Sequence, residues 1–485
     1  MVKTQLAVVG GGPGGYAAAF LAADLGMQVT LIDLEKNPGG VCLYRGCIPS
    51  KALLHVAKLI HEADEAKKWG VEFGEPKIDI NKLRDFKNGV VNKMTGGLGQ
   101  LCKSRKVNYI NGRATFANSN TLSVAKVDGT TEEVVFEKAI LATGSVPAKV
   151  PGLSIDSPRV MDSTAALELN DVPKRLLVIG GGYIGLELST VYAALGSKVT
   201  VVEMLPGILP GADRDLVAVL EKRVKATMEN VFVETKVVEL RESSVRSPSD
   251  VPSGKETSNG IQVKLEGKDV AESVQTFDKV LISVGRKPVT AGLGLENTKV
   301  KVNERGFVVV DKTQQTDDKS IFAIGDIVGN PMLAHKAAAE GKVAVEVILG
   351  HKAAFEPNAI PAVVFTDPEL AWTGLSETEA REKGIKVEVA KFPWAASGRA
   401  TTLNRNDGMT KLVIEPETER ILGVGIVGVG AGDMIAEGTL AIEMGAVVKD
   451  LELTIHPHPT LSETMMFAAE LFYGHATDMY RPKRK

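Results

Sequence analysis

The feature that most constrains the fold of this 485-residue chain is a glycine-rich pattern that occurs twice. Each copy consists of an apolar run, a cluster of glycines, a stretch with helical patterning and a second apolar run that ends in an acid. That acid, Asp33 or Glu203, lies 23 positions after the first glycine of its copy. The repeat predicts two βαβ units. In the first, the glycines at 10–15 follow an apolar run at 6–9, and the second run is at 29–32. In the other, the glycines at 180–185 follow a run at 176–179, and the second run is at 199–202.

Glycines at this spacing suit the binding of a dinucleotide. The first permits a tight turn, the second lets the backbone approach a pyrophosphate, and the third lets strand and helix pack closely. The helix N-terminus offers N–H groups and a partial positive charge to the phosphates, and the acid accepts hydrogen bonds from a ribose. One such motif is weak support, because any tight strand-to-helix turn can match it. Two copies with equal acid spacing predict two dinucleotide sites.

The second unit is expected to prefer NAD to NADP. Its acid, Glu203, is followed by Met-Leu-Pro and not by a group of arginines. A carboxylate at this position repels the 2′-phosphate that distinguishes NADP from NAD.

Length and patterning predict an α/β protein with several domains. A chain of 485 residues has room for about three domains. Two Rossmann-like dinucleotide-binding domains are expected at 1–150 and 151–283, followed by a central domain at 284–356. From about residue 357 the glycine fingerprint is absent, and strands are interspersed with amphipathic helices. Residues 357–485 are therefore expected to form a separate α+β domain.

Composition argues against several functional classes. A net charge of −3 gives no electrostatic footprint for nucleic acid or an anionic membrane, and the basic tail at 481–485 is too short to change this. Uncharged stretches at 7–23 and 176–186 are interrupted by glycines, which favours strand–turn–helix units over membrane spans. No targeting signal is evident, so a cytoplasmic protein is expected. The Ser- and Pro-rich stretch 242–260 predicts a polar surface loop.

Two of the three cysteines lie directly after the first βαβ unit. Four residues separate Cys42 from Cys47, and Cys102 is left over. Three cysteines are too few for a disulfide-stapled secreted fold, and no further ligand at zinc spacing lies nearby, so no metal is expected. Spacing alone is also compatible with an inert pair. The position after a nucleotide-binding unit favours a pair that exchanges electrons with a flavin.

Two further groups could support thiol chemistry. Lys51 lies one helical turn after Cys47, where a cation would favour a thiolate and a reduced flavin. A lone lysine at this position could equally lie on a solvent-exposed face of the helix without a catalytic role. Near the other end, His456 and His458 are each followed by proline, and Glu463 comes five residues after the second. Imidazole is a suitable base for a thiol, and a carboxylate could orient the ring. In isolation, this stiff loop would favour a structural reading.

Together these motifs resemble the pyridine nucleotide–disulfide oxidoreductase family, and within it the dihydrolipoamide dehydrogenases. The likeness covers essentially the whole chain in family order. It implies an enzyme that oxidises dihydrolipoamide to lipoamide through a redox-active disulfide and FAD, and that reduces NAD⁺ to NADH. The matching stretches are 10–15, 39–54, 95–98, 180–187, 321–326, 332–337, 392–399 and 456–463.

The resemblance also implies which residues hold the two cofactors. For FAD these are Gly10, Gly12, Pro13, Gly14, Gly15, Asp33, Gly40, Val41, Cys42, Lys51, Ala114, Thr143, Gly144, Ser145, Gly325, Asp326, Met332, Leu333 and Ala334. For NAD they are Gly180, Gly182, Tyr183, Ile184, Gly185, Glu203, Val237, Ser283, Val284, Gly285 and Arg286.

The catalytic residues that the resemblance implies are Cys42, Cys47, Lys51, Glu187, His458 and Glu463. Cys42 and Cys47 form the disulfide, with Cys42 meeting the substrate and Cys47 lying against the flavin. Glu187 is the partner of the flavin-side lysine, and His458 is the acid–base residue, oriented by Glu463. In this family the histidine comes from the other subunit, which implies a homodimer. The substrate would be carried on lipoyl domains of a partner protein, in a 2-oxoacid dehydrogenase complex.

Some positions depart from the family pattern. Tyr44 and Arg45 lie between the cysteines, where many members carry Asn-Val, and Arg45 could lower a cysteine pKa or shift the redox potential. Asp33 replaces a common glutamate, with a shorter reach to the ribose. Ala114 replaces a glycine that is often found there. None of these changes removes a catalytic group.

Other functions fit the sequence less well. Glutathione and mercuric reductases usually prefer NADP, which Glu203 disfavours, and mercuric reductases use C-terminal cysteines, whereas none follows Cys102. A soluble transhydrogenase would lack the cysteine pair. A flavin-binding structural subunit with lapsed catalysis would have lost part of the catalytic set, and all of it is present.

Overall fold

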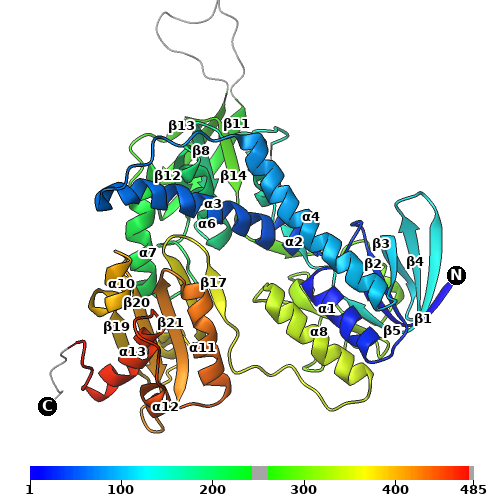
Figure 1. The fold of residues 1–485 in the computed structure, drawn as a ribbon. Coiled ribbons are helices and arrows are strands. Elements are labelled where there is room, and N and C mark those ends of the chain that lie inside the picture. The colour runs from blue at the N-terminus through cyan, green and yellow to red at the C-terminus, as the bar shows by residue number, and fades with distance from the viewer. Residues whose placement is uncertain (154, 243–259, 480–485) are drawn as a thin grey trace, which may run out of the picture.

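The computed structural model describes residues 1–153, 155–242 and 260–479. Positions 243–259 of the expected surface loop, and the basic tail, lie outside these residues. Three sheets dominate the described chain: an N-terminal one on the right of Figure 1, a middle one at the upper left, and a C-terminal one at the lower left. The prediction of an α/β protein with two dinucleotide-binding units and a C-terminal α+β part is confirmed.

The N-terminal sheet is built on the first predicted βαβ unit. Helix α1 (Pro13–Asp24) connects β1 (Val2–Val9) to β2 (Val29–Asp33), and these strands pair in parallel. The parallel pairings give the order β3–β2–β1–β5–β16, and β4 closes an antiparallel meander between β3 and β5. The remaining strands are β3 (Asn108–Asn118), β4 (Thr121–Lys126), β5 (Thr131–Leu141) and β16 (Ile321–Ala323).

The segment expected to be a central domain contributes to this same sheet. Strand β16 pairs with β5, and helix α8 (Ala334–Ile348) packs against α1. The two helices approach each other closely at Gly14 of α1: a Cβ on this residue would lie only 3.0 Å from the carbonyl oxygen of Ala337. Helices more than 300 positions apart in sequence therefore form one layer on a face of this sheet. The short helices η3 (Leu295–Asn297) and η4 (Gly325–Val328) contribute apolar side chains to the core on the other face.

The middle sheet repeats this architecture with the second glycine motif. Helix α6 (Tyr183–Ala194) connects β8 (Arg175–Ile179) to β9 (Lys198–Val202), and all five strands are parallel in the order β10–β9–β8–β14–β7. A three-stranded antiparallel sheet lies beside it. The other elements of this region are β7 (Val160–Met161), α5 (Ser163–Glu168), α7 (Arg214–Thr227), β10 (Asn230–Phe232), β11 (Thr235–Glu242), β12 (Ile261–Gly267), β13 (Val274–Phe277) and β14 (Lys279–Ile282).

Two connections join the N-terminal and middle sheets. Strand β6 (Ser145–Pro147) pairs with β15 (Arg286–Pro288), so the chain crosses between the sheets twice at one place. Helix α3 (Cys47–Glu65) packs against α6 of the middle sheet, and α4 (Ile80–Ser104) packs against α3. The cysteine segment therefore lies between the two nucleotide-binding units, with α2 (Gly40–Arg45) before α3 and η1 (Ala66–Trp69) after it.

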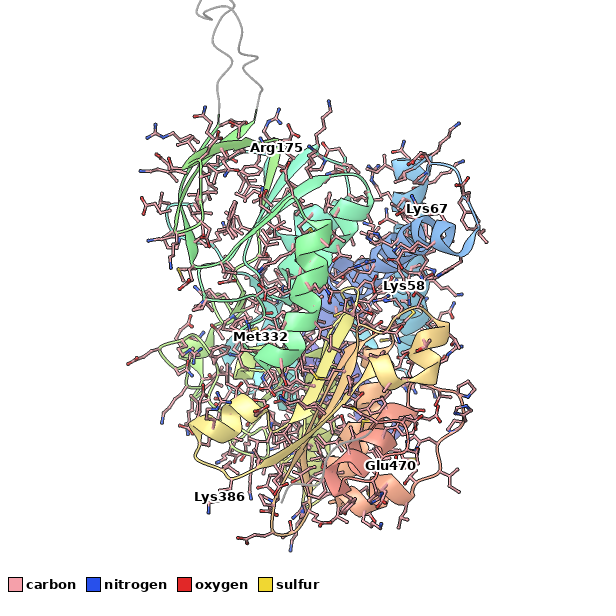
Figure 2. All side chains as sticks on the ribbon, turned by 90° about the vertical axis from the view of Figure 1, so that its left-hand side faces the viewer. Lys58, Lys67, Arg175, Met332, Lys386 and Glu470 are labelled. Atoms are coloured by element: carbon pink, nitrogen blue, oxygen red, sulfur yellow. The ribbon has the colours of Figure 1, made fainter. Side chains whose placement is uncertain are left out.

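The C-terminal sheet is antiparallel, in the order β17–β18–β21–β20–β19. Figure 2 shows α7 of the middle sheet standing against it, and apolar side chains of both belong to one core. Its elements are β17 (Ala362–Val364), β18 (Glu369–Gly374), α9 (Glu377–Glu382), β19 (Glu388–Pro393), η5 (Trp394–Ala396), α10 (Gly398–Thr402), β20 (Met409–Ile414), β21 (Ile421–Gly428), α11 (Ala431–Glu443), α12 (Val448–Leu453) and α13 (Glu463–Tyr473). Among the described helices, none has both the length and the apolar run that a bilayer span requires.

Candidate active site

An elongated cavity of about 430 Å³ runs from the first glycine turn, past both cysteines, to the start of α6. Most residues that the resemblance assigns to FAD line it: Gly10, Gly12, Pro13, Gly14, Asp33, Gly40, Val41, Cys42, Lys51, Ala114, Thr143, Gly144, Ser145, Gly325, Asp326, Met332 and Ala334. Gly15 and Leu333 do not line it. Gly15 packs against the backbone of Gly10, and Leu333 is the residue before α8.

The walls of this cavity fit a dinucleotide. Gly10 has a φ of +107°, which favours glycine, and a Cβ on Gly15 would lie 1.8 Å from the Gly10 carbonyl oxygen. A Cβ on Gly12, by contrast, would meet nothing closer than 3.9 Å, so this position is open for the approach of a ligand. The glycines therefore divide into those that build the turn and one that faces open space, as the fingerprint predicts.

The acids that end β2 and β9 occupy equivalent positions. Oδ2 of Asp33 accepts a hydrogen bond from the backbone N–H of Gly11 at 2.5 Å. Oε2 of Glu203 accepts one from Gly181 at 2.7 Å. Each carboxylate thus holds its own glycine turn and lies beside it, where a ribose would follow a pyrophosphate.

The residues assigned to NAD are divided between two places. Tyr183, Ile184 and Arg286 line the cavity described above. Burial raises the pKa of Tyr183 to about 12, so its phenol is neutral and can donate a hydrogen bond. The others lie at or near the second glycine turn, outside this cavity: Gly180, Gly182, Gly185, Glu203, Ser283, Val284 and Gly285. Val237 is a buried side chain of the neighbouring antiparallel sheet.

The two cysteines stand at the junction of α2 and α3, with Gly46 between the helices. Both are thiols in this structure, and a hydrogen bond joins the two side chains. That bond lowers the pKa of Cys47 to about 7, with a further contribution from the Lys51 ammonium, and raises the pKa of Cys42. The Lys51 ammonium therefore favours a thiolate within the reduced pair.

Lys51 meets the partner expected for it. Its ammonium lies 2.8 Å from Oε2 of Glu187, which is almost fully buried in α6. Ser50 Oγ donates to the same oxygen at 3.0 Å, and the N–H of Phe365 donates to Oε1 at 3.0 Å. The Lys51 ammonium also lies over the Phe365 ring, 4.5 Å from its centroid. These hydrogen bonds hold the Glu187 carboxylate in place, and the carboxylate in turn holds the Lys51 ammonium beside the cysteine pair.

The two histidines of the His-Pro motif have different environments. His456 is buried, with Nδ1 at 2.8 Å from the Thr454 carbonyl and Nε2 at 2.7 Å from Glu437. The His458 side chain is 78% exposed, and Nδ1 lies 2.9 Å from Oε1 of the buried Glu463. Glu463 thus fixes the ring and leaves Nε2 facing outward. His458 therefore has the geometry of an oriented base, and His456 has that of a structural residue.

His458 and Glu463 do not line the cavity of their own chain. They lie between α12 and α13 of the C-terminal part, whereas the cysteines lie beside α6. The same part of the chain exposes large apolar side chains on α11 and in the segment before His456: Leu440 at 62%, Met444 at 76%, Leu453 at 67% and Ile455 at 95% exposed. Such a surface on a chain of this size is typical of a protein–protein interface.

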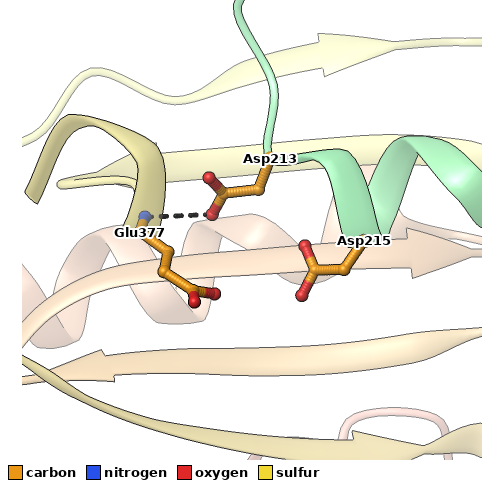
Figure 3. Close-up of side chains that lie close together, drawn as sticks. All are labelled: Asp213, Asp215 and Glu377. Atoms are coloured by element: carbon orange, nitrogen blue, oxygen red, sulfur yellow. Dashed lines mark hydrogen bonds between the residues drawn. The ribbon is translucent and has the colours of Figure 1, made fainter. Parts of the chain in front are cut away.

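Away from the cavity, three carboxylates lie within metal-ligand distance of one another: Asp213, Asp215 and Glu377 (Figure 3). The chain itself supplies the cation they need. The ammonium of Lys411, 1% exposed, lies 2.7 Å from Asp213, 3.0 Å from Asp215 and 2.9 Å from Glu377. Lys391 pairs with the outer side of the same cluster. This group therefore joins α7 to the C-terminal sheet.

The sequence assigned Arg286, Ser145 and Asp326 to cofactor sites, but it did not predict their mutual contacts. It also did not place Glu35 and Arg45 at the cavity. Arg286 donates to Ser145 Oγ at 2.7 Å and to its carbonyl at 2.7 Å, and Ser145 Oγ donates to Asp326. These three residues form one network, although Arg286 was expected at the NAD site and Ser145 and Asp326 at the FAD site. Glu35 and Arg45 also line the cavity and form an ion pair. The position of Glu35, two residues after Asp33, could have indicated that it lies at the cavity, but the glycine fingerprint assigns no role to this position.

Comparison with known proteins agrees with this geometry. The pyridine nucleotide-disulphide oxidoreductase model matches residues 4–341, and the dimerisation domain of that family matches residues 360–469. Proteins named dihydrolipoyl dehydrogenase from Vibrio cholerae and Haemophilus influenzae are 49% and 47% identical, over 100% of this chain and 98% of theirs. One from Geobacillus stearothermophilus is 45% identical over 98% of this chain and 97% of its own.

Solved structures show the same fold. The HOCl-induced flavoprotein disulfide reductase RclA from Escherichia coli superposes with a TM-score of 0.84 at 29% identity, covering 97% of this chain and 100% of that one. LpdA from Mycobacterium tuberculosis superposes with a TM-score of 0.87 at 25% identity, again covering 97% and 100%. The chain belongs to the pyridine nucleotide-disulphide oxidoreductase family.

Proposed function

We propose that the protein oxidises dihydrolipoamide to lipoamide and reduces NAD⁺ to NADH, as the names of its full-length relatives imply. The observation that carries this proposal is the Cys42–Cys47 pair, set against the Lys51–Glu187 ion pair at the wall of a glycine-lined cavity. A thiolate-stabilising cation beside a close cysteine pair is what thiol–disulfide exchange requires.

The cofactors are FAD and NAD. The first glycine turn, Asp33, and the Ser145–Asp326 network would hold FAD, and the second glycine turn with Glu203 would hold NAD. FAD bound there would supply a two-electron acceptor for the reduced cysteines and a hydride donor for NAD⁺. The carboxylate of Glu203 repels a 2′-phosphate, so NAD⁺ is the preferred acceptor.

The cysteines carry out the thiol chemistry. A substrate thiolate attacks Cys42 of the oxidised pair, and a mixed disulfide forms while Cys47 leaves as a thiolate. The second substrate thiol then attacks the mixed disulfide, which releases lipoamide and leaves Cys42 reduced. Two electrons and two protons have then left the substrate. The Lys51 ammonium lowers the pKa of Cys47 and so favours its departure as a thiolate, because a more acidic thiol leaves faster.

His458 supplies the base for these steps, and Glu463 orients it. The imidazole does not line the cavity of its own chain, and it lies within the matched dimerisation domain, which also exposes large apolar side chains. We place it in the active site of the second subunit of a homodimer, where Nε2 takes the proton of the attacking substrate thiol.

A His458→Gln variant is expected to lose roughly 10²- to 10⁴-fold in turnover, the usual contribution of a general base. The more telling experiment mixes it with the Cys42→Ser variant, which is inactive for a different reason. A hybrid dimer has one site with both an intact cysteine pair and a partner's intact histidine. Equal mixing after dissociation should restore about a quarter of wild-type activity, because half of the dimers are hybrids with one working site.

The mixing experiment has a clear contrary outcome. If His458 served the cysteines of its own chain, each hybrid site would still lack one group and no activity would return. Mixing each variant with itself provides the control for losses during dissociation and reassociation.

The half-reaction tests the proposed function itself. The oxidised enzyme is mixed with one equivalent of dihydrolipoamide and no NAD⁺, then alkylated and digested. We expect the equivalent to be consumed and new alkylation to map to Cys42 and Cys47, with Cys102 unchanged. An enzyme that keeps dihydrolipoamide intact, or that labels neither of the pair, would contradict the proposal.

The match to a dimerisation domain indicates a homodimer. The likeness to proteins named dihydrolipoyl dehydrogenase indicates a role in 2-oxoacid dehydrogenase complexes. We propose that lipoyl domains of a partner protein carry the substrate to the cavity. We further propose boundaries at 1–150 for the FAD-binding domain, 151–283 for the NAD-binding domain, 284–356 for the segment that completes the FAD site, and 357–485 for the interface domain.

A further inference from the structure

The loop at 34–39 connects β2, which ends in Asp33, to the helix that carries Cys42. Two side chains between the cysteines reach back to this loop. The guanidinium of Arg45 forms an ion pair with the carboxylate of Glu35, and both residues line the cavity. Tyr44 donates from Oη to the carbonyl of Asn37 at 3.0 Å. The residues that depart from the family pattern therefore bind the loop in front of them.

Glu35 is a fixed partner for this contact. Its N–H donates to Asp33 Oδ1 at 2.8 Å. Its carbonyl accepts from Tyr109 Oη at 2.7 Å and from Asn111 Nδ2 at 2.9 Å, both on β3 of the sheet. Through Arg45, the segment between the cysteines is thus joined to the rigid N-terminal sheet.

The end of the loop and the start of α2 pack closely on their neighbours. A Cβ on Gly39 would lie 3.1 Å from the ring of Tyr44, so the loop backbone packs on that ring. A Cβ on Gly40 would lie 2.5 Å from Cα of Gly12, in the first glycine turn. Movement of the loop would therefore displace the turn that faces the pyrophosphate position.

Arg45 does not act mainly on the thiols. The largest influences on the pKa values of Cys42 and Cys47 are their mutual hydrogen bond, burial and the Lys51 ammonium. The charge of Arg45 acts instead on Asp33, where it opposes the rise in pKa that burial causes. The Arg45 charge therefore interacts with the acid at the position expected for the ribose.

We propose that Arg45 is a positioning residue for FAD: by pairing with Glu35 it closes the loop 34–39 over the dinucleotide end of the cavity and so slows release of the cofactor. This rests on the FAD site proposed above. The sequence left open whether Arg45 lowers a cysteine pKa or shifts the redox potential; the proposal instead gives it a role in cofactor retention, with thiol acidity left unchanged.

The test measures release of FAD from the holoenzyme, as recovery of free-flavin fluorescence in a moderate concentration of chaotrope. Arg45→Gln is expected to release FAD about fivefold faster, the effect of losing one good partly exposed ion pair. Arg45→Lys keeps the charge and should stay close to wild type. Lys36→Gln, a matched control, removes the same charge from an exposed residue of the same loop and should leave the rate unchanged.

Two further readouts separate positioning from a general loss of stability. The charge-reversed pair Arg45→Glu with Glu35→Arg should recover slow release, whereas each single reversal should not. The pH dependence of Cys47 alkylation should be the same in Arg45→Gln as in wild type. Unchanged FAD release in Arg45→Gln, or a shifted alkylation profile with unchanged release, would overturn the proposal. A wild-type protein that never holds FAD would instead contradict the FAD site itself.

Discussion

Replacing Cys42 with serine is expected to lower dihydrolipoamide-dependent NADH formation about a thousandfold or more, the scale of losing a covalent catalytic group. A hydroxyl cannot form the mixed disulfide that Cys42 must make with the substrate, so no later step can repair the loss. FAD should stay bound, because Cys42 is only one of many residues around the cavity. The measurement is the initial rate of NADH formation, with flavin absorbance to show that the cofactor is retained.

Cys102→Ser is the matched control for this substitution. Cys102 is 3% exposed and belongs to the apolar core beside α1, away from the pair. Its replacement should leave the rate nearly unchanged per folded dimer. A Cys42→Ser variant that retained more than a few per cent of the wild-type rate would show that electrons reach the flavin without this cysteine.

Replacing Lys411 with methionine is expected to destabilise the fold by about 3 kcal/mol, because it leaves the buried carboxylate of Asp213 without its cation. Lys411 is the central group of the cluster that joins α7 to the C-terminal sheet, and it contacts all three acids. The measurement is the midpoint of thermal unfolding of the FAD-loaded dimer. The control is Lys391→Met, which removes a half-exposed charge from the same cluster and should cost about 1 kcal/mol or less.

The pH dependence of this effect has a definite sign. Burial alone would raise the pKa of Asp213, but hydrogen bonds from Lys411 and Thr378 outweigh it and lower the pKa to about 2. A lowered carboxyl pKa contributes stability above its ordinary value near 4, and that contribution is lost as the pH falls toward 2. The difference between wild type and Lys411→Met should therefore narrow as the pH falls through this window. A difference that stayed constant would show that the charges of the cluster are not its source.

Most of the fold that could be predicted from the sequence followed from local patterns. The two glycine motifs gave the strand–turn–helix units correctly, because each motif and its acid form one contiguous structure, as the Asp33–Gly11 and Glu203–Gly181 hydrogen bonds show. The pairing of β16 with the N-terminal sheet was not predicted, since nothing local in a three-residue strand indicates its partner.

The contacts that sequence reasoning missed are those between distant segments. Lys411 meets Asp213 across 198 positions, and a lone lysine in a strand carries no sign of a buried partner. Arg45 reaches Glu35 over only ten positions, yet the family pattern drew attention to the cysteines rather than to the loop before them. The Arg286–Ser145–Asp326 network links residues that motif reading assigns to different cofactors. Their proximity depends on how β6 and β15 pair.

The most direct test of the central claim is the rate of NADH formation from dihydrolipoamide and NAD⁺, measured beside a parallel reaction with NADP⁺. We predict fast turnover with NAD⁺, and a rate with NADP⁺ at least about tenfold lower because Glu203 repels the 2′-phosphate. That result requires an intact cysteine pair, histidine and second glycine site together. An FAD-loaded protein that forms no NADH from dihydrolipoamide, or that prefers NADP⁺, would contradict the proposed reaction.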